Sequence, residues 1–194
     1  GWGCFRQSQK TGCLDHFKSP FHRLHALFEY KQKRQALRLF SGIGAISPYV
    51  EKTLIEDGFH HTQVFPIYNF IENSKEIAPE EKRSPPLLLV VSRLVPLKGI
   101  EALLKNLFFI KHLNWQCCIF GDGPLEQDLK HLTHTLQLED RVFWKGKRPP
   151  EEIKKALKEA AVFIQPNRGP EGFGLAVAEA ISHKIPVLAY DVPA

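Results

Sequence analysis

From residue 87 onward, short apolar runs alternate with amphipathic segments at a regular spacing. The expected strands, each of four to six residues, lie at 87–91, 115–120, 141–145, 162–165 and 186–190. The first, Leu-Leu-Leu-Val-Val, is typical of a strand buried on both faces. Between the runs, apolar side chains recur at helical spacing in residues 98–112, 125–138, 175–183 and a segment that begins at 149. This alternation predicts an α/β fold with a doubly wound parallel sheet, because parallel strands need helical crossovers.

The length of 194 residues allows one full domain and part of another. An apolar content of 43% and a charged content of 24% are ordinary for a globular protein. The chain has no methionine and stops just after an apolar run, so we interpret it as an internal fragment of a longer protein. It has no apolar run of about 18 residues, so we expect no transmembrane helix, and no secretory signal is recognisable at its start.

A polar, charged and proline-bearing stretch at residues 72–86 suits an interdomain linker. We expect residues 87–194 to form the parallel-sheet domain, truncated at its C-terminus, and residues 1–71 to be the C-terminal remnant of another domain. The elements expected in that remnant are helices at 24–39 and 48–57, strands at 42–47 and 63–67, and a loop over the first twenty residues.

Positive charge is concentrated at the start of the chain. Residues 1–40 hold eight Lys or Arg against two acidic residues, within a net charge of +5. Such a segment could face an anionic substrate or a membrane surface, and a solvated helix face explains it equally well. No recognised nucleic-acid-binding motif accompanies the charge, so we predict no nucleic-acid partner.

The four cysteines do not predict a disulfide framework in a chain of this length. Cys117 and Cys118 are neighbours in an expected strand and are most simply small buried apolar residues. Cys4, Cys13 and His16 are residue types that bind metals, but the two cysteines are spaced more widely than in a usual zinc knuckle. We predict no metal site, and we expect a reducing, cytoplasmic compartment.

Residues 171–179, Glu-Gly-Phe-Gly-Leu-Ala-Val-Ala-Glu, carry the strongest chemical signal. Gly172 and Gly174 leave the backbone N–H groups open to a ligand, at the start of a helix whose unpaired donors favour an anion. If the segment is helical, Glu171 and Glu179 lie about 12 Å apart. A dipole-stabilised acid and a solvated Glu would explain each carboxylate alone. Together with the turn, they predict a phosphate cradle between two hydroxyl-binding carboxylates.

Three other turns follow expected strands. Arg93 and Lys98 bracket the first turn, where a planar guanidinium and an ammonium suit a diphosphate, although two solvated basic residues would give the same pattern. Residues 121–123 echo a dinucleotide fingerprint without its third glycine, and a tight turn with Asp122 near a helix cap is the simpler interpretation. Gly146 leaves its backbone open to the edge of a base, and a plain turn explains it equally well.

Taken together, these turns resemble one family. The segments are Ser-Arg-Leu at 92–94, Lys-Gly at 98–99, Gly-Asp-Gly-Pro at 121–124, Gly146, Pro-Glu-Gly-Phe-Gly at 170–174, Glu-Ala at 179–180 and Pro-Val at 186–187. Their combination resembles the donor-binding domain of the retaining glycosyltransferases of family 4. The resemblance covers about residues 40–194, because residues 46–47 and 64–69 look like the last strands of that family's N-terminal domain. The family usually has a glycine where this chain has Lys184.

The resemblance implies the GT-B fold, with a doubly wound, Rossmann-like donor domain and a remnant of a second Rossmann-like domain. It also implies three catalytic residues. Arg93 and Lys98 hold the donor's diphosphate and stabilise the leaving nucleotide, and Glu171 contacts the transferred sugar.

Donor binding is implied for six further residues. Glu179 accepts hydrogen bonds from the ribose hydroxyls, and Gly146 contacts the base. The sugar and phosphate are lined by the backbone amides of Gly172, Phe173, Gly174 and Leu175. The donor is a UDP- or GDP-sugar, and neither a cofactor nor a metal is required.

The implied activity is transfer of a sugar from a nucleotide-diphosphate sugar to a polysaccharide or lipid-linked acceptor, with retention of anomeric configuration. Peripheral association with the inner face of the membrane is compatible with such an acceptor. We expect the fragment alone to be inactive, because transfer in this fold needs both domains. The alternatives are a Rossmann-type nucleotide-binding module without transferase activity and an NAD(P)-dependent oxidoreductase. The incomplete glycine fingerprint argues against the oxidoreductase.

Overall fold

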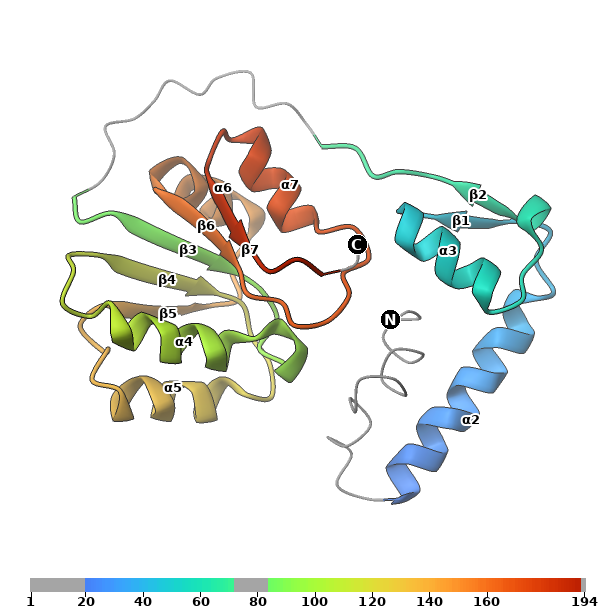
Figure 1. Cartoon of the computed structure of the whole chain (residues 1–194), viewed down its shortest axis with the longest axis horizontal. Helices are drawn as coiled ribbons and strands as arrows, with labels where there is room; N and C mark the ends of the chain where they lie inside the picture. The colour runs from blue at the N-terminus through green and yellow to red at the C-terminus, as the bar shows by residue number, and fades with distance from the viewer. Residues whose placement is uncertain (1–19, 72–83, 193–194) are drawn as a thin grey trace. The chain divides into compact units, whose positions relative to one another are not determined.

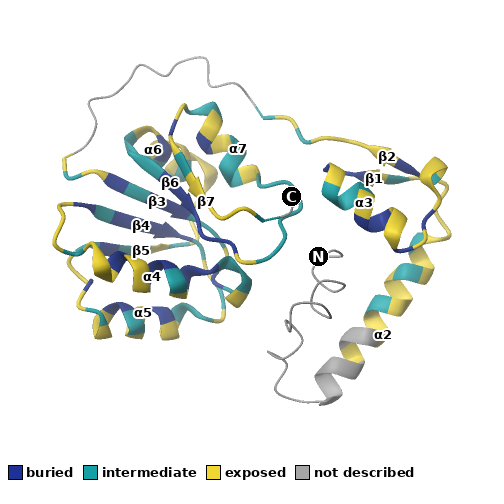
Figure 2. Cartoon of the chain, viewed as in Figure 1, coloured by how far each residue is buried: buried dark blue, intermediate teal, exposed yellow. Residues whose placement is uncertain are grey.

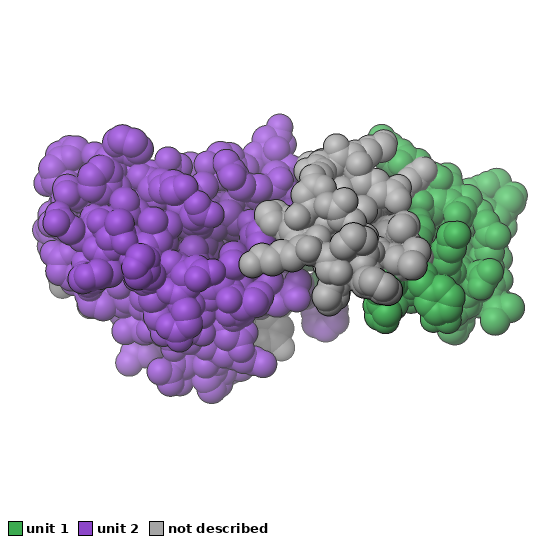
Figure 3. All heavy atoms as spheres, turned by 90° about the horizontal axis from the view of Figure 1, so that it is seen from below, with its two compact units in different colours: residues 1–69, 170–173, 193–194 green, residues 70–169, 174–192 purple. Residues whose placement is uncertain are grey.

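A computed structural model describes residues 20–71 and 84–192. Contacts between residues divide the chain into two compact units (Figure 3). The described residues of the smaller unit are 20–69 and 170–173, and those of the larger unit are 70–71, 84–169 and 174–192. The loop expected at the start of the chain, with Cys4, Cys13 and His16, lies outside the described residues.

The larger unit is built on a sheet of five parallel strands in the order β5-β4-β3-β6-β7 (Figure 1). The strands are β3 (Leu87–Val91), β4 (Gln116–Phe120), β5 (Val142–Gly146), β6 (Val162–Gln165) and β7 (Val187–Ala189). Every neighbouring pair is parallel, so each connection crosses from one end of the sheet to the other. The predicted doubly wound parallel sheet is confirmed.

Helices cover both faces of this sheet (Figures 1 and 2). They are α4 (Ile100–Phe109), α5 (Glu126–Thr135), α6 (Pro150–Glu159) and α7 (Leu175–Ser182). One buried cluster joins α4 and α5 to one face, and a second joins α6 and α7 to the other. In β3, Val90 belongs to the first cluster and Leu89 to the second, and both are fully buried. The continuous apolar run therefore forms a strand because both of its faces are covered.

Cys117 and Cys118 lie on opposite faces of β4, because successive side chains of a strand alternate. Both side chains are buried, as the sequence predicts, and neither forms a disulfide with another described residue. Burial raises the pKa of the Cys117 thiol, so this sulfur stays protonated and is a packing group rather than a nucleophile.

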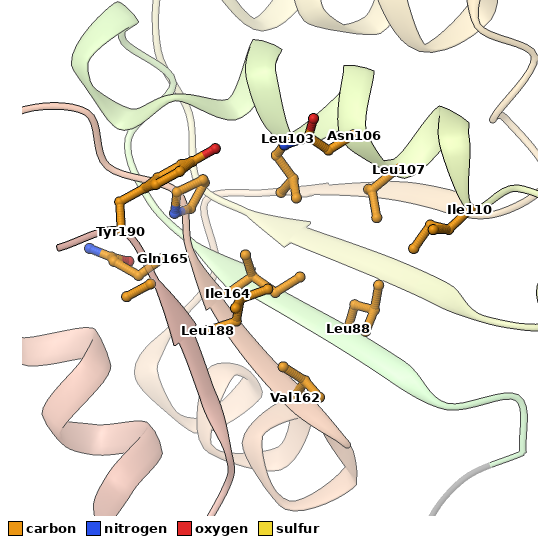
Figure 4. Close-up of a pocket in the computed structure, with 12 residues that line it drawn as sticks. Leu88, Leu103, Asn106, Leu107, Ile110, Val162, Ile164, Gln165, Leu188 and Tyr190 are labelled. Carbon is orange, nitrogen blue, oxygen red and sulfur yellow. The ribbon is translucent and has the colours of Figure 1, made fainter.

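An apolar groove of about 430 Å³ lies between α4 and the β6–β7 side of the sheet (Figure 4). It is lined by Leu88, Leu103, Asn106, Leu107, Ile110, Val162, Ile164, Gln165, Pro166, Leu188, Ala189 and Tyr190. Leu188 of β7 remains 62% exposed, because α4 does not extend over this strand. The groove contains none of the predicted site residues.

The smaller unit contains a second, shorter crossover. Its elements are α2 (Pro20–Leu37), β1 (Ile43–Ala45), α3 (Pro48–Glu56), the 3-10 helix η2 (His61–Gln63) and β2 (Val64–Pro66). The strands β1 and β2 pair in parallel, and α3 connects them. The buried residues Ala45, Leu54, Phe59 and Val64 form the core of the unit. None of the described helices, in either unit, is long and apolar enough to cross a membrane.

The largest differences from the predicted elements are at helix ends. Residues 96–98 form the 3-10 helix η3 (Pro96–Lys98), and α4 begins only after Gly99, which has a left-handed backbone (φ 67°). The predicted helix at 125–138 ends as α5 at Thr135, because Gln137 adopts a left-handed conformation (φ 55°). The helices were predicted from the spacing of apolar residues, and this spacing does not reveal a residue in the left-handed conformation.

Candidate functional site

The site is best located by the order of the strands. β3 and β6 are neighbours in the sheet, but the chain leaves β3 toward β4 and leaves β6 toward β7. The two connections therefore diverge at the carboxyl ends of these strands. In open α/β sheets, ligands bind in the crevice at this switch point.

The connection after β3 carries the two predicted cations. Arg93 is exposed, and Lys98 is half-buried as the last residue of η3. Backbone hydrogen bonds fix the loop against the neighbouring connection, because Leu94 donates its N–H to Asp122 O at 2.7 Å. Asp122 lies three residues before Leu125, the N-cap residue of α5, and no side chain caps that helix. The backbone of Asp122 braces the β3 loop instead.

The loops after β3 and β6 are in close backbone contact. Arg168 donates its backbone N–H to Leu97 O at 2.8 Å. A Cβ atom on Gly99 would lie 1.9 Å from Pro166 O, so the two main chains approach closely only because residue 99 is glycine. This contact positions Lys98 beside the exit from β6.

The connection after β6 ends in an uncapped helix. Gly174 is the N-cap of α7, has a left-handed backbone (φ 81°) and provides no side-chain hydrogen bond. The first N–H groups of α7 have no partner within the helix and carry the positive end of its dipole. Leu175 opens the helix and Glu179 lies one turn further on, and both side chains are exposed.

The distance of about 12 Å predicted between Glu171 and Glu179 assumed a helical segment, and that assumption is wrong. Residues 171–174 are not helical, so a helical rise cannot be applied from Glu171 to Glu179. Glu171, Gly172 and Phe173 are half-buried in the segment that joins β6 to α7, and by their contacts they group with the smaller unit.

Six of the nine predicted site residues belong to the larger unit: Arg93, Lys98, Gly146, Gly174, Leu175 and Glu179. Gly146 ends β5, two strands away from β3, and its carbonyl accepts the N–H of Gly121 at 2.9 Å. No atom lies within 4 Å of the position that a Cβ on Gly146 would take, so its backbone faces open space. The sheet thus brings cations, an uncapped helix and an open glycine to the carboxyl ends of its strands.

Arg168 is the residue that the sequence analysis did not single out. It follows the buried Asn167 in the β6 connection and is exposed. The available signal was a basic residue three positions after the expected strand at 162–165, at a carboxyl end where a ligand is expected. The nearby glutamate–glycine motif dominated the interpretation.

Comparison with known proteins identifies the family. The family model described as glycosyl transferases group 1 matches residues 72–194, well over half of the chain. The chain belongs to this family. The matched segment contains all nine residues predicted for the site.

Two curated bacterial relatives show the range of names within the family. The amylovoran biosynthesis glycosyltransferase AmsK of Erwinia amylovora is 33% identical over 112 residues, which are 54% of this chain and 28% of AmsK. The exopolysaccharide phosphotransferase SCO2592 of Streptomyces coelicolor is 32% identical over 118 residues, which are 59% of this chain and 12% of that protein. The chain therefore spans well under a third of either relative.

Solved structures confirm the fold. The crystal structure of Anabaena Alr3699/HepE in complex with UDP and glucose superposes with a TM-score of 0.69 at 25% identity, covering 81% of this chain and 46% of the other. Staphylococcus aureus TarM, crystallised as a mutant with UDP and other ligands, gives a TM-score of 0.70 at 24% identity, covering 84% of this chain and 32% of TarM. The GT-B assignment made from the sequence is confirmed by these neighbours.

Proposed function

We propose that this chain is the donor-binding part of a retaining glycosyltransferase of family 4. The intact protein moves a sugar from a nucleotide-diphosphate sugar to a polysaccharide or lipid-linked acceptor and retains the anomeric configuration. In this proposal residues 87–194 bind the donor, residues 72–86 link the two domains, and residues 1–71 are the end of the acceptor-side domain.

One observation carries the proposal. The β3 loop, with Arg93 and Lys98, and the uncapped start of α7 leave the sheet from adjacent strands at the switch point. A diphosphate leaving group develops negative charge as its bond to the sugar breaks. Fixed cations and helix N–H groups stabilise that charge without a metal ion, because they are positioned before the reaction begins.

The other predicted residues complete a donor site in this proposal. Glu179 accepts hydrogen bonds from the ribose hydroxyls, and Gly146 contacts the edge of the base. Glu171 contacts the transferred sugar, and the amides of residues 172–175 line the sugar and phosphate. No cofactor takes part, since the nucleotide is the leaving group of the donor substrate.

The donor and acceptor classes rest on similarity to other proteins. HepE was crystallised with UDP and glucose, and AmsK is named for amylovoran biosynthesis. We therefore propose a UDP- or GDP-sugar as donor and a glycan or lipid-linked acceptor, used by a cytoplasmic protein at the inner face of the membrane. Residues 1–194 alone transfer no sugar in this proposal, because transfer requires both domains to close over the donor.

The test is titration calorimetry of the intact protein with UDP and with GDP. Glu179→Ala should weaken binding of the preferred nucleotide about 10- to 100-fold, which corresponds to one or two lost hydrogen bonds to a charged acceptor. Glu151→Ala is the matched control, because Glu151 is an 82% exposed glutamate on another helix whose contact with Lys154 is a surface pair. Equal affinities of wild type and Glu179→Ala would contradict the role of Glu179.

Binding and activity measurements on the same intact protein distinguish the glycosyltransferase from the two alternative functions. Binding of NAD(P) in place of UDP and GDP would favour the oxidoreductase. Binding of a nucleotide sugar without transfer or hydrolysis, across a panel of UDP-, GDP- and ADP-sugars, would favour a binding module without turnover.

A further inference from the structure

The β6 connection holds a basic side chain at the same switch point. Arg168 follows Asn167, which is only 2% exposed, and its backbone N–H is bound to Leu97 O at 2.8 Å. Its main chain is therefore fixed at its N-terminal side, although its side chain is exposed. A fixed backbone with an exposed guanidinium reduces the entropy lost when that group binds a ligand.

The stem of Arg168 lies over the turn that carries Lys98. A Cβ atom on Gly99 would be 3.2 Å from Arg168 Cγ, so the aliphatic part of the side chain packs on the backbone of residue 99. Gly99 directly follows Lys98 and is the N-cap of α4, which has no side-chain cap. Arg168 is thus held beside Lys98 and beside a helix start.

The guanidinium group makes no hydrogen bond or ion pair with any residue in the described part of the chain. Its donors are therefore available to a ligand, in contrast to those of Arg141, which donates from Nη1 to Leu113 O at 2.6 Å. A planar guanidinium can bind two phosphate oxygens at once, which an ammonium such as Lys98 cannot do with the same geometry.

We propose that Arg168 is a third cationic contact of the donor diphosphate, acting with Arg93 and Lys98. The inference rests on the proposed function, because the anion it binds is the diphosphate of the nucleotide sugar. Two connections then supply the cations, one from β3 and one from β6. The backbone contact between these two loops, from Arg168 N–H to Leu97 O, holds the two sets of cations beside each other.

The experiment uses calorimetry of the intact protein with UDP, GDP and the matching monophosphates. Arg168→Met keeps an unbranched side chain and removes the charge. Arg168→Lys keeps the charge and removes the planar guanidinium that can bind two oxygens. Lys155→Met is the matched control, because Lys155 is an exposed cation on α6. Thermal unfolding of each variant without ligand measures any purely structural effect.

We expect Arg168→Met to weaken binding of the preferred diphosphate about tenfold, the effect of one charge-assisted hydrogen bond. The loss for the monophosphate should be smaller, since it carries less charge. Arg168→Lys should recover part of the affinity, and Lys155→Met should bind as wild type does. Arg168→Met with wild-type affinity for UDP and GDP, while the wild type binds one of them, would overturn the role of Arg168 and leave the proposed function standing. A wild type that binds neither nucleotide would overturn both.

Discussion

Two helices of this chain begin in opposite ways. α3 of the smaller unit starts with Ser47, whose Oγ accepts the N–H of Val50 at 3.2 Å, followed by Pro48 and Glu51 in the first turn. α7 of the larger unit starts with Gly174, which has no side chain to accept a hydrogen bond, and has no acidic residue in its first turn. In α3 a side chain accepts a hydrogen bond from an N-terminal N–H group, and an acidic residue offsets the positive end of the helix dipole. In α7 the N-terminal N–H groups and the positive end of the dipole remain available to a ligand.

A missing side-chain cap does not by itself mark a site, because α5 and α6 also begin without one. Both of these helices have acidic residues in their first turn, however, whereas α7 has neither a cap nor an acid there. A glycine at the N-cap costs a few tenths of a kcal/mol of stability relative to a good side-chain cap. α4 also begins without a side-chain cap, because its N-cap residue is Gly99. The two helices that follow β3 and β6, on either side of the switch point, are thus both uncapped. A bound diphosphate would offset this cost in the proposed complex.

The largest expected effect tests whether these glycines are structural requirements. Gly99→Ala should destabilise the larger unit by about 3 kcal/mol, because the new methyl would meet Pro166 O at 1.9 Å and the backbone is left-handed. Gly146→Ala is the control. It has the same φ of 67° but open space around it, so only the conformational cost of about 1 kcal/mol remains. Urea denaturation measures both, and equal losses would show that the close loop contact is not important.

A second pair of variants separates capping from ligand binding. Ser47→Ala should cost about 1 kcal/mol of stability and leave affinity for UDP and GDP unchanged, because it only removes a helix cap. Gly174→Ala should cost a similar 1 kcal/mol through its left-handed backbone. It should also weaken nucleotide binding about tenfold, since it shifts the N–H groups at the start of α7. Calorimetry and denaturation are both needed. A Gly174→Ala protein that binds nucleotide normally would break the comparison between α3 and α7.

The last comparison concerns the C-terminal ends of the same two helices, where the smallest single effect is expected, at Lys184. α3 and α7 both end in a Schellman motif, with Gly58 or Lys184 in the left-handed position (φ 87° and 57°). Lys184→Gly should raise stability by about 0.5 kcal/mol, because glycine adopts this conformation without strain. Gly58→Ala should lower stability by about 1 kcal/mol for the converse reason. The change in thermal midpoint checks both, and a destabilised Lys184→Gly would show that its side chain contributes more than its backbone costs.

Lys184 also shows how far the resemblance to a family could be trusted. The sequence departs there from the family's usual glycine, which put the turn geometry in question. The structure keeps the turn, with Ile185 N–H bound to Ala180 O at 3.1 Å and Lys184 N–H bound to Ile181 O at 2.9 Å. Two backbone hydrogen bonds hold a lysine in a conformation that local propensity disfavours.

Much of the fold and part of the candidate site could be read from the residues alone. Strand β3 was predicted at its observed bounds, because burial on both faces demands a continuous apolar run. The glycines and cations at the strand ends were likewise visible, since a parallel sheet must gather its connections at one edge. The non-helical start of the 171–179 segment was not visible, because apolar spacing carries no information about the φ of Gly174.

Local pattern in the sequence by itself determined the elements, their parallel pairing and the residue types at the carboxyl edge. Only the tertiary structure decided which loops meet there. The contact of Gly99 with Pro166, and the placement of Arg168 over that turn, join residues almost seventy positions apart in the chain. Such contacts depend on which strands are neighbours in the sheet. β3 and β6 are neighbours because of the way in which the whole sheet assembles between its two layers of helices.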